Sequence, residues 1–322
     1  MKGIVQDRYG TADELELREI ERPHIADHEV LIRVVAAGVD RGVWHLMTGR
    51  PYLIRLMGYG LRSPKNPIRG AEVAGVVESV GKNVTRFKPG DEVYGIAQGS
   101  FAEFARARED KLAPKPSSLS FEQAAAVPIS GSTALQALSK GEIRAGQKVL
   151  IIGASGGVGT WAVKLAKAYG AEVTGVSSTT KMDLVRSIGA DDVIDYTRED
   201  FTDGRRQWDL IIDIGGNRSL SHLRSALTPR GTLVIVGGET GGKVTGGFGR
   251  TLRAPFVSLF ARQKLTGLTS KESAEFLLEL NELIHANKLE PAIDRTFPLS
   301  ETPKAIRYME DGHARGKVVI VP

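Results

Sequence analysis

The chain has 322 residues, of which 41% are hydrophobic and 25% charged, and it contains 37 glycines and no cysteine. This length and apolar content are typical of about two globular domains and exclude disorder as the main state. The absence of cysteine excludes disulfides, thiolate nucleophiles, iron–sulfur clusters and zinc sites built on sulfur. The glycine surplus indicates tight turns or close approaches of the backbone to a ligand.

The net charge is +5, from 43 Lys and Arg against 38 Asp and Glu, and we expect it to be spread without a Lys/Arg block. Such a balance indicates an anionic ligand only weakly and gives little support to a nucleic-acid partner. The first residues, MKGIVQDRYG, lack the apolar stretch of a secretory signal, and no run of 18 apolar residues predicts a membrane span. We therefore expect a soluble, cytoplasmic protein with a small-molecule substrate.

Short apolar segments separated by Gly and Pro predict β-strands in the first third of the chain, at residues 30–37, 72–80, 91–94 and 101–105. This spacing is typical of a compact, largely antiparallel, barrel-like unit. Residues 50–69 have no clean period and mix aromatic residues with Gly and Pro. We predict a long loop with a short helix there, of the kind that often carries specificity.

From Val149 onward, strands and helices alternate, after a predicted helix that begins at the N-cap Ser120. Repeated βαβ units predict an α/β fold with a doubly wound parallel sheet. The glycine-dense residues 237–249 are expected to be mobile. A helix around residues 276–284 and a return to the β-rich unit near residues 296–321 complete the chain. The predicted strands of the sheet lie at residues 149–152, 173–176, 193–194, 210–213 and 233–236.

Residues 149–159, VLIIGASGGVG, form the sharpest functional motif. Ala154, Gly156 and Gly159 occupy the first, third and sixth positions of G-x-G-x-x-G, with Ala in place of the first Gly. The motif follows an apolar strand and begins a helix, which is the context of a dinucleotide site. We predict that the pyrophosphate lies against Ala154, Ser155, Gly156, Gly157, Val158 and Gly159.

The end of the second strand of this unit indicates which dinucleotide binds. A site for NADH places Asp or Glu there to hold the ribose hydroxyls. The chain instead carries Ser177, Ser178 and Lys181, which can hydrogen-bond and neutralise a 2′-phosphate. We therefore predict NADPH rather than NADH, with Tyr196 near the adenosine; an ordinary solvated lysine and a core tyrosine are the alternatives.

Four stretches together resemble the medium-chain dehydrogenase/reductases, in particular their zinc-free quinone oxidoreductase branch. They are RGAEVAGVVESVG, KPGDEVYG, AAAVPISGSTALQAL, and VLIIGASGGVGTWAVKLAKAYGAEV followed by IGADDVIDY. The resemblance implies a GroES-like catalytic domain, made of residues 1–122 and 270–322, around a Rossmann NAD(P)-binding domain at residues 123–269. It also implies a cleft between the domains and a homodimer formed through the last Rossmann strand, at about residues 265–268; a tetramer stays open.

The same resemblance assigns further positions by motif. Thr133 corresponds to a residue that touches the nicotinamide half of the cofactor. Gly215, Val236, Gly237 and Gly238 follow the fourth and fifth strands of the sheet. Since the carboxyl ends of the strands in a doubly wound sheet face the ligand crevice, fold and resemblance agree on these residues.

Three positions correspond to the catalytic zinc ligands of the zinc alcohol dehydrogenases: Asp40, Ala71 and Ile129. Alanine and isoleucine cannot ligate a metal, so we expect no zinc and hydride transfer without a Lewis acid. Glu72 is expected to have a structural role. Lys317, in RGKVVIV, is expected at the surface, with a position that reaches the cleft as the alternative.

Asp40 and His45, in GVDRGVWHLMTG, are the candidate catalytic residues. Asp40 aligns with an Asn near the nicotinamide of relatives, and His45 with an active-site Tyr or Lys. An imidazole there could donate the proton or hydrogen-bond the carbonyl oxygen. A turn cap for Asp40 and a packed or surface histidine for His45 are the structural alternatives. Trp44, Tyr52 and Tyr59 are the candidate walls of the substrate site, with simple packing as the alternative.

Without a metal to polarise a plain ketone, a conjugated acceptor is the easier target because it spreads the incoming charge itself. The first hypothesis is therefore a zinc-independent, NADPH-dependent oxidoreductase that acts on quinones or α,β-unsaturated carbonyls. A second is an NAD(P)-dependent alcohol dehydrogenase or carbonyl reductase with His45 as acid and base. A third is an NADPH-binding scaffold or sensor with little catalysis.

Overall fold

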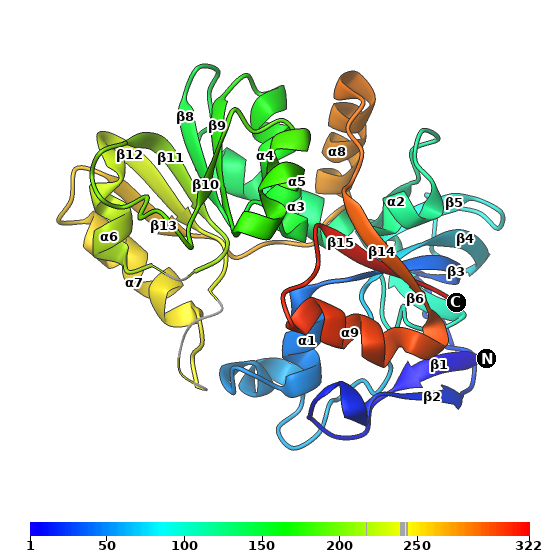
Figure 1. Cartoon of the computed structure of the whole chain (residues 1–322). Helices are drawn as coiled ribbons and strands as arrows, with labels where there is room; N and C mark the ends of the chain where they lie inside the picture. Colours follow the sequence, from blue (N-terminus) through cyan, green and yellow to red (C-terminus); the bar gives the residue numbers. More distant parts are fainter. Residues whose placement is uncertain (217, 239–241, 243) are drawn as a thin grey trace. The chain divides into compact units, whose positions relative to one another are not determined.

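The computed structural model describes residues 1–322 except 217, 239–241 and 243, and it divides into two units (Figure 1). Unit 1 consists of Met1–Ser132 and Glu272–Pro322, and unit 2 of Thr133–Lys271. The boundaries expected from the sequence lie at 122/123 and 269/270. The first boundary lies later because helix α3 (Pro128–Lys140) begins in unit 1 and continues into unit 2.

Unit 1 is built on a seven-stranded sheet in which β3 is the central strand, because it pairs with β4, β6 and β15. The path of strands is β14-β15-β3-β4-β5-β7, with the pair β14–β15 parallel and the others antiparallel; β1 and β2 form a separate pair. The strands are β1 (Lys2–Val5), β2 (Glu16–Glu19), β3 (Glu29–Val39), β4 (Glu72–Val80), β5 (Glu92–Ile96), β6 (Phe104–Arg108), β7 (Leu112–Pro114), β14 (Ile293–Pro298) and β15 (Lys317–Val321).

Alternation of apolar residues explains why these segments form strands around one core. Val30, Ile32 and Val34 on β3 are buried in a cluster with Val73 and Val77 on β4. The predicted strand at residues 101–105 begins later, at Phe104, although Phe101 is fully buried. The helices of unit 1 are α1 (Arg41–Thr48), α2 (Phe121–Ala125), α8 (Ala274–Asn287) and α9 (Thr302–Glu310), and α2 begins with the capping box of Ser120 and Gln123.

Unit 2 contains a parallel six-stranded sheet in the order β10-β9-β8-β11-β12-β13, which confirms the predicted doubly wound fold. Chain order reverses between β8 and β11, so the ligand crevice is expected at the carboxyl ends of these strands. The strands are β8 (Lys148–Ile152), β9 (Glu172–Ser177), β10 (Asp192–Asp195), β11 (Trp208–Asp213), β12 (Leu227–Ile235) and β13 (Lys264–Gly267), and three of the helices are α4 (Gly157–Ala168), α5 (Met182–Ser187) and α6 (Leu220–Ser225).

Helix α7 (Phe248–Ser258) was missed by the sequence analysis, which ended its glycine-dense segment at Gly249. Pro255 lies inside the helix, so the local sequence argues against it. Tertiary packing outweighs this preference, because Ala254 is fully buried against the sheet together with Leu265. The mobility expected for residues 237–249 lies partly outside the described residues.

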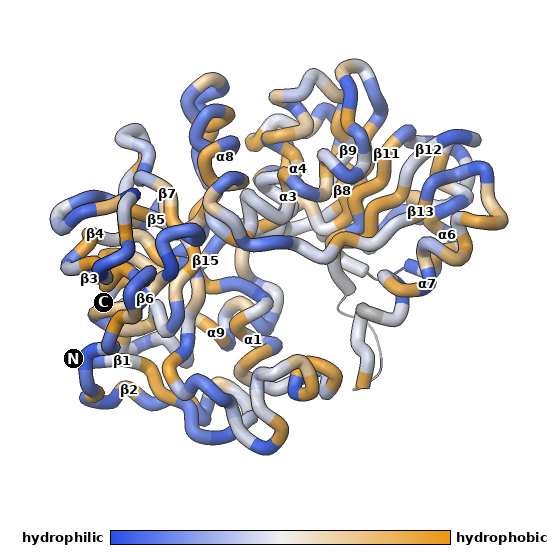
Figure 2. The backbone as a smooth tube through the Cα atoms, turned by 180° about the vertical axis from the view of Figure 1, so that it is seen from behind, coloured by the Kyte–Doolittle hydropathy of each residue, from blue (hydrophilic) through white to orange (hydrophobic). Residues whose placement is uncertain are grey.

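Apolar residues gather on the strands of both sheets, as the orange colour in Figure 2 shows. The strands of unit 2 are apolar on both faces, as parallel strands covered by helices require. Among the described residues, no helix has the length and apolarity needed to cross a membrane.

Candidate functional site

The predicted pyrophosphate loop connects β8 to α4. Gly153, rather than Ala154, has the positive φ, at 85°, so the tight turn lies one residue before the position matched to the first Gly of the motif. Ala154 is fully buried and Ser155 is 8% exposed. A Cβ at Gly159 would lie 2.1 Å from the carbonyl oxygen of Gly153, so this glycine is required for helix α4 to pack on the loop.

Gly156 has a different reason to be glycine. The nearest protein atom to a Cβ placed there is the carbonyl oxygen of Gly153, at 3.6 Å, and its φ of −85° suits any residue. The packing of the protein itself therefore gives no reason for glycine at this position. No side chain caps this N-terminus. Open space, backbone N–H groups and the helix dipole together fit the pyrophosphate of a dinucleotide.

The residues predicted to hold a 2′-phosphate lie at the carboxyl ends of β9 and β10. The N–H of Tyr196 donates to the carbonyl oxygen of Ser177 at 3.2 Å, which brings the two strand ends together. Ser177 is buried, its hydroxyl donates to the carbonyl oxygen of Ser178, and the ring of Tyr196 is exposed. Lys181 follows in the short 3₁₀ turn Thr179–Lys181.

Asp195, an acidic residue that the sequence analysis left out, lies on β10 opposite Ser177. Its carboxylate accepts hydrogen bonds from the hydroxyls of Thr179 and Thr197 and from the N–H of Thr197. These bonds lower the pKa of Asp195 below its usual value. The carboxylate is thus committed to ordering the loops around the strand ends. Its place directly after an apolar strand was the signal that could have identified it.

The remaining cofactor residues also lie at the carboxyl edge of the sheet in unit 2. Thr133 on α3 is 8% exposed, and its hydroxyl donates to the hydroxyl of Ser270, which follows β13, at 3.2 Å. Gly215 follows β11, and Val236, Gly237 and Gly238 follow β12. A Cβ at Gly216 would lie 2.2 Å from the Cα of Gly238, so glycine lets these two backbones touch.

A buried ion pair at the same edge was not predicted. Asp213, the last residue of β11, accepts a hydrogen bond from the N–H of Gly216 at 2.9 Å and one from Nη2 of Arg250 on α7 at 2.5 Å. Burial raises the pKa of Asp213, while Arg250 opposes that shift. The pair holds the turn after β11 against the start of α7.

Asp40, the first candidate catalytic residue, is the N-cap of α1. Its Oδ1 accepts the N–H of Val43 at 3.1 Å, and its side chain lies almost entirely inside unit 1. Its Oδ2 is buried and has no hydrogen-bond partner among the described residues. Oδ1 of Asp40 therefore acts as a helix cap, which is the structural alternative for this residue. Oδ2 remains available to accept a hydrogen bond.

His45 lies one turn further along α1, beside Trp44, with the two ring centroids 5.0 Å apart. Its Nδ1 lies 2.8 Å from the carbonyl oxygen of Arg50. A carbonyl oxygen only accepts, so Nδ1 carries the hydrogen of this bond. Nε2 then carries a proton to donate only when the ring is the imidazolium.

Tyr52 and Tyr59, the other candidate substrate residues, lie in the segment after α1. The guanidinium of Arg55 stacks over the ring of Tyr52, 4.8 Å from its centroid. The hydroxyl of Tyr9 donates to the carbonyl oxygen of Tyr59 at 2.9 Å. Both tyrosine rings are exposed rather than packed in the core of unit 1.

Lys317 is buried, with 3% exposure, so the sequence expectation of a surface lysine is wrong. Its ammonium donates to Oε2 of Glu72, which is fully buried, and to the hydroxyl of Ser130 at 3.4 Å. The first residues of β15 and β4 thus meet across β3. They do so over Gly38, where a Cβ would lie 2.4 Å from Oε2 of Glu72.

The other oxygen of Glu72 accepts the N–H of Ile129 at 2.8 Å, in the first turn of α3. Burial raises the pKa of Glu72 to about 7; Lys317 lowers it, and the nearby carboxylate of Asp40 raises it. The buried ammonium of Lys317 is therefore the counter-ion of Glu72, which lies near the carboxylate of Asp40.

These residues do not fit a zinc ion at the positions that the resemblance indicates. Ala71 and Ile129 have no donor atom, and one oxygen of Asp40 is already occupied as a helix cap. The ammonium of Lys317 would also repel a divalent cation beside Glu72. Lys317 and Glu72 instead join β4, β15 and α3 through their ion pair and hydrogen bonds.

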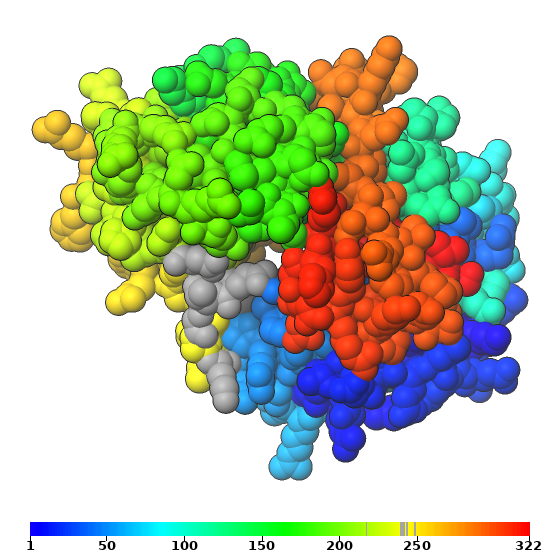
Figure 3. Space-filling model, viewed as in Figure 1, coloured from blue at the N-terminus to red at the C-terminus, as the bar shows by residue number. Residues whose placement is uncertain are grey.

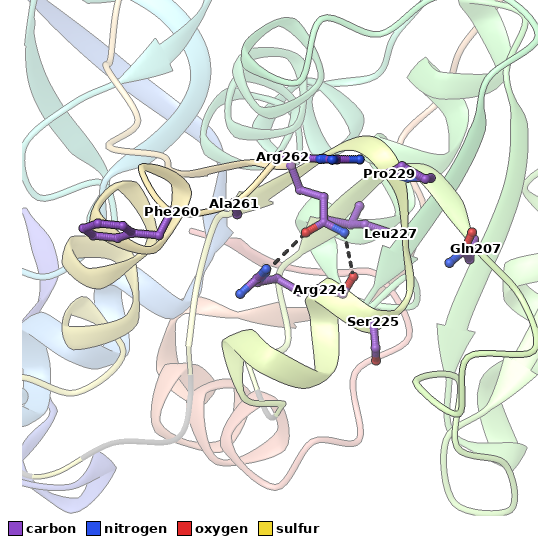
Figure 4. A pocket seen from close by; sticks show the side chains of 9 residues that line it. Gln207, Arg224, Ser225, Leu227, Pro229, Phe260, Ala261 and Arg262 are labelled. Carbon is purple, nitrogen blue, oxygen red and sulfur yellow. Dashed lines mark hydrogen bonds between the residues drawn. The ribbon is translucent and has the colours of Figure 1, made fainter.

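A pocket of 470 Å³ in unit 2 contains none of the predicted site residues (Figure 4). Gln207, Leu227 and Gln263 in its wall precede or begin β11, β12 and β13, so it lies at the amino ends of these strands. Gln263 and Arg224 exchange two hydrogen bonds across it, drawn as dashed lines. Ligands of doubly wound sheets bind at the opposite, carboxyl edge.

Two family models match the chain. Residues 26–117 match the alcohol dehydrogenase GroES-like domain, and residues 188–320 match the zinc-binding dehydrogenases. The first match confirms the GroES-like unit expected from the resemblance. The second family is named for zinc binding, but Ala71 and Ile129 have no side-chain atom that could ligate zinc.

Curated relatives and solved structures match the entire chain. The chain is 35% identical to the "NADPH-dependent alkenal/one oxidoreductase, chloroplastic" of Arabidopsis thaliana, over 100% of this chain and 80% of that protein. The quinone oxidoreductase structure from Coxiella burnetii has a TM-score of 0.87 and 30% identity, covering 100% of this chain and 99% of that one.

The Escherichia coli quinone oxidoreductase complexed with NADPH gives a TM-score of 0.85 at 26% identity, with 100% of both chains covered. Identity of 35% over the whole of this chain and 80% of a relative, the GroES-like match and the doubly wound sheet all indicate one family. The chain therefore belongs to the medium-chain dehydrogenase/reductase superfamily, among its quinone and enone oxidoreductases.

Proposed function

We propose that this chain is an NADPH-dependent reductase that transfers hydride to a quinone or an α,β-unsaturated carbonyl without a metal ion. The observation that carries the proposal is the uncapped N-terminus of α4 behind Gly156, where the protein leaves room that its own packing does not require. Relatives named for alkenal/one and quinone reduction support the substrate class.

The chain's own residues would bind the cofactor at three places. The loop from Gly153 to Gly159 would hold the pyrophosphate, and Ser177, Ser178, Lys181 and Tyr196 would hold the 2′-phosphate and adenosine. Thr133 and the glycines after β11 and β12 would hold the nicotinamide half. When bound, the reduced nicotinamide supplies the hydride.

The absence of donor atoms at Ala71 and Ile129 supports a reaction without zinc. The acceptor must then stabilise much of the developing charge by itself, which favours conjugated over saturated carbonyls. His45 would supply the proton as the imidazolium, because its Nδ1–H is directed to the carbonyl oxygen of Arg50. Asp40 would contribute its unpartnered Oδ2 as an acceptor.

The deciding experiment follows NADPH oxidation with a quinone, an enone, a saturated ketone and an aldehyde, each assayed with and without EDTA. Turnover of the quinone or enone that EDTA does not reduce supports the proposal. Equal or better turnover of the saturated ketone would instead support a carbonyl reductase. Tight NADPH binding without turnover of any acceptor would support the scaffold or sensor hypothesis.

The role of His45 is tested by its pH dependence. For the wild type we expect kcat to fall as pH rises through the imidazole range, and for His45→Phe we expect a lower kcat without that fall. His222→Phe, on α6, is the matched control. An unchanged pH profile in His45→Phe would exclude His45 as the proton donor.

We infer a homodimer from the edge of the sheet in unit 2. β13 is the last strand of the sheet, and α7 packs along it, with the N–H of Leu265 donating to the hydroxyl of Ser258 at 3.0 Å. The outer side of α7 and the residues after it leave Leu252, Phe256, Leu259 and Phe260 exposed. Phe256→Glu with Phe260→Glu should give monomers in sedimentation velocity, and an unchanged mass would refute this interface.

A cytoplasmic location is our remaining proposal for this chain. Relatives with chloroplastic and mitochondrial names show that the family occurs in other compartments as well. Fractionation of the source cells, with detection of the native chain by antibody, is the measurement that decides.

A further inference from the structure

Positive charge is concentrated in one segment of unit 1, contrary to the even spread expected from the sequence. Residues 41–71, named here the basic segment, contain six Lys and Arg and no Asp or Glu. Since the rest of the chain has 37 basic and 38 acidic residues, the basic segment accounts for the whole positive net charge. Among its cations, Arg50, Arg62 and Lys65 are exposed, and none of these three forms an ion pair with a described residue.

The same segment presents apolar side chains to solvent. Leu56 is 74%, Met57 61% and Leu61 65% exposed, and the rings of Tyr52 and Tyr59 are exposed beside them. These five side chains lie within ten residues of sequence. Isolated exposed apolar residues are ordinary on a soluble protein, whereas such a cluster marks an interaction surface. Figure 3 shows the light-blue part of the chain at the molecular surface.

Side chains of Arg55 and Tyr9 hydrogen-bond to the backbone of this segment. Arg55 donates from Nε to the carbonyl oxygen of Gly49 at 2.9 Å, and its guanidinium stacks over Tyr9 at 4.3 Å. The hydroxyl of Tyr9 donates to the carbonyl oxygens of Tyr59 and Gly60 at 2.9 and 2.7 Å. The loop is therefore fixed by polar contacts, and its outward leucines and methionine do not serve its own packing.

We propose that the basic segment docks unit 1 on an anionic lipid surface. Apolar side chains that enter the headgroup region, flanked by Arg and Lys that pair with acidic headgroups, are the two elements of interfacial membrane binding. The charge of the segment is complementary to such a surface. A second copy of this chain would bring the same cations together and be repelled.

The docking surface lies next to the candidate substrate residues in sequence and in structure. Trp44 and His45 belong to α1, which the segment contains. Tyr52 follows α1, and Tyr59 is the last residue of a π-helix, Arg55–Tyr59, which is the short helix that the sequence predicted within residues 50–69. Apolar quinones and enals partition into lipid, so docking would bring unit 1 to a store of acceptor. Membrane binding itself does not depend on the proposed reaction and can be tested separately.

The test is co-flotation of the full chain with vesicles of phosphatidylcholine alone or with 30% phosphatidylglycerol, a composition of about one acidic headgroup in three. We expect flotation with the acidic vesicles only, reduced at least about tenfold by Leu56→Ser/Met57→Ser/Leu61→Ser and by Arg62→Glu/Lys65→Glu. High salt should reduce it as well. The proposal would be overturned if the wild type does not float with acidic vesicles at low salt, or if both variants float as well as the wild type.

Two control variants carry matched changes elsewhere in unit 1. Lys82→Glu/Lys88→Glu repeats the charge change, and Leu17→Ser/Leu278→Ser removes exposed apolar side chains outside the segment. Both should float like the wild type. NADPH oxidation with a water-soluble quinone should be the same in controls and loop variants, so failure of docking is distinguished from failure of the reaction. Concentration-dependent association that the loop variants abolish, without flotation, would assign the segment to a second copy and refute lipid docking.

Discussion

The pyrophosphate loop of unit 2 and the buried ion pair of unit 1 are built in opposite ways. The loop is made of backbone, over the seven residues from Gly153 to Gly159. Packing requires glycine at Gly159, whereas at Gly156 the protein leaves space, which we propose is for the pyrophosphate. The ion pair is made of side chains from Glu72 and Lys317, which are 245 residues apart in the chain. The first is local and the second exists only after folding.

This difference explains why one region was predicted and the other was not. A backbone site leaves its mark as glycines at fixed spacing between a strand and a helix. A side-chain pair leaves no spacing at all, because its two residues begin strands on either side of β3. Lys317 therefore resembled an ordinary surface lysine until the sheet brought it to Glu72.

The largest expected effect comes from removing the cation of the pair. Lys317→Met leaves Glu72 buried without its partner, and its pKa, already raised to about 7 by burial, rises further. We expect a loss of about 3–5 kcal/mol in the free energy of unfolding at pH 8.5, where the folded protein must either bury an unpaired carboxylate or keep a proton on Glu72 that the unfolded chain has released. The loss should be much smaller at pH 6, where a proton neutralises the carboxyl. Thermal denaturation at the two pH values measures this.

The double variant Glu72→Gln/Lys317→Met is the control for this prediction. It removes both charges and keeps an oxygen that can accept the N–H of Ile129, so it should recover most of the stability at pH 8.5. In Glu72→Gln alone, the stability that the wild type loses as pH rises from about 4.5 to 7 should no longer be lost. If Lys317→Met alone is as stable as the double variant at pH 8.5, the electrostatic pairing of Glu72 with Lys317 does not stabilise the fold.

The next effect concerns the packing glycine of the loop. Gly159→Ala places a Cβ 2.1 Å from the carbonyl oxygen of Gly153, and backbone must move to accommodate it. We expect unit 2 to lose about 1–3 kcal/mol of stability through overpacking. Urea denaturation followed by the fluorescence of Trp161 and Trp208, both in unit 2, measures it. Wild-type stability would mean that α4 can shift at no cost.

Gly156→Ala separates ligand space from packing. Since the nearest protein atom to the new Cβ is 3.6 Å away, stability should change by less than about 1 kcal/mol, mainly through the N-cap preference. The Kd for NADPH should rise at least about tenfold, which corresponds to about 1.4 kcal/mol. Fluorescence titration of NADPH gives this value without an assay of turnover. Unchanged affinity would remove Gly156 from the pyrophosphate site.

The smallest expected effect on stability comes from substitutions of Asp40, which separate its capping of α1 from a role of its charge in the reaction. Asp40→Ala removes the cap of α1 and should cost about 1 kcal/mol, whereas Asn caps helices as well as Asp and should change stability by less than about 0.5 kcal/mol. If Asp40→Asn nevertheless changes kcat, the charge of the carboxylate acts in the reaction. Wild-type kcat in this stable variant would leave Asp40 with its capping role alone.

Elements with a strong local pattern were predicted closely. The strands at residues 72–80 and 317–321 and the N-cap at Ser120 agree with the structure. Helix α7 was missed because Pro255 and nearby glycines hide a segment that only burial of Ala254 makes helical. The pair of Asp213 with Arg250 was missed because its partners are 37 residues apart in the chain. Asp195 was missed although its place after an apolar strand was a local signal.

The sequence by itself determined the two-unit architecture, the parallel sheet and the glycine-rich loop between β8 and α4, because hydrophobic periodicity and glycine spacing act over a few residues. Only the tertiary structure decided that Lys317 is the buried partner of Glu72, that Asp40 uses one oxygen to cap α1, and that an exposed apolar loop accompanies the cations of residues 41–71. Burial and charge pairing depend on which distant segments meet, and the linear chain does not contain that information in any local pattern.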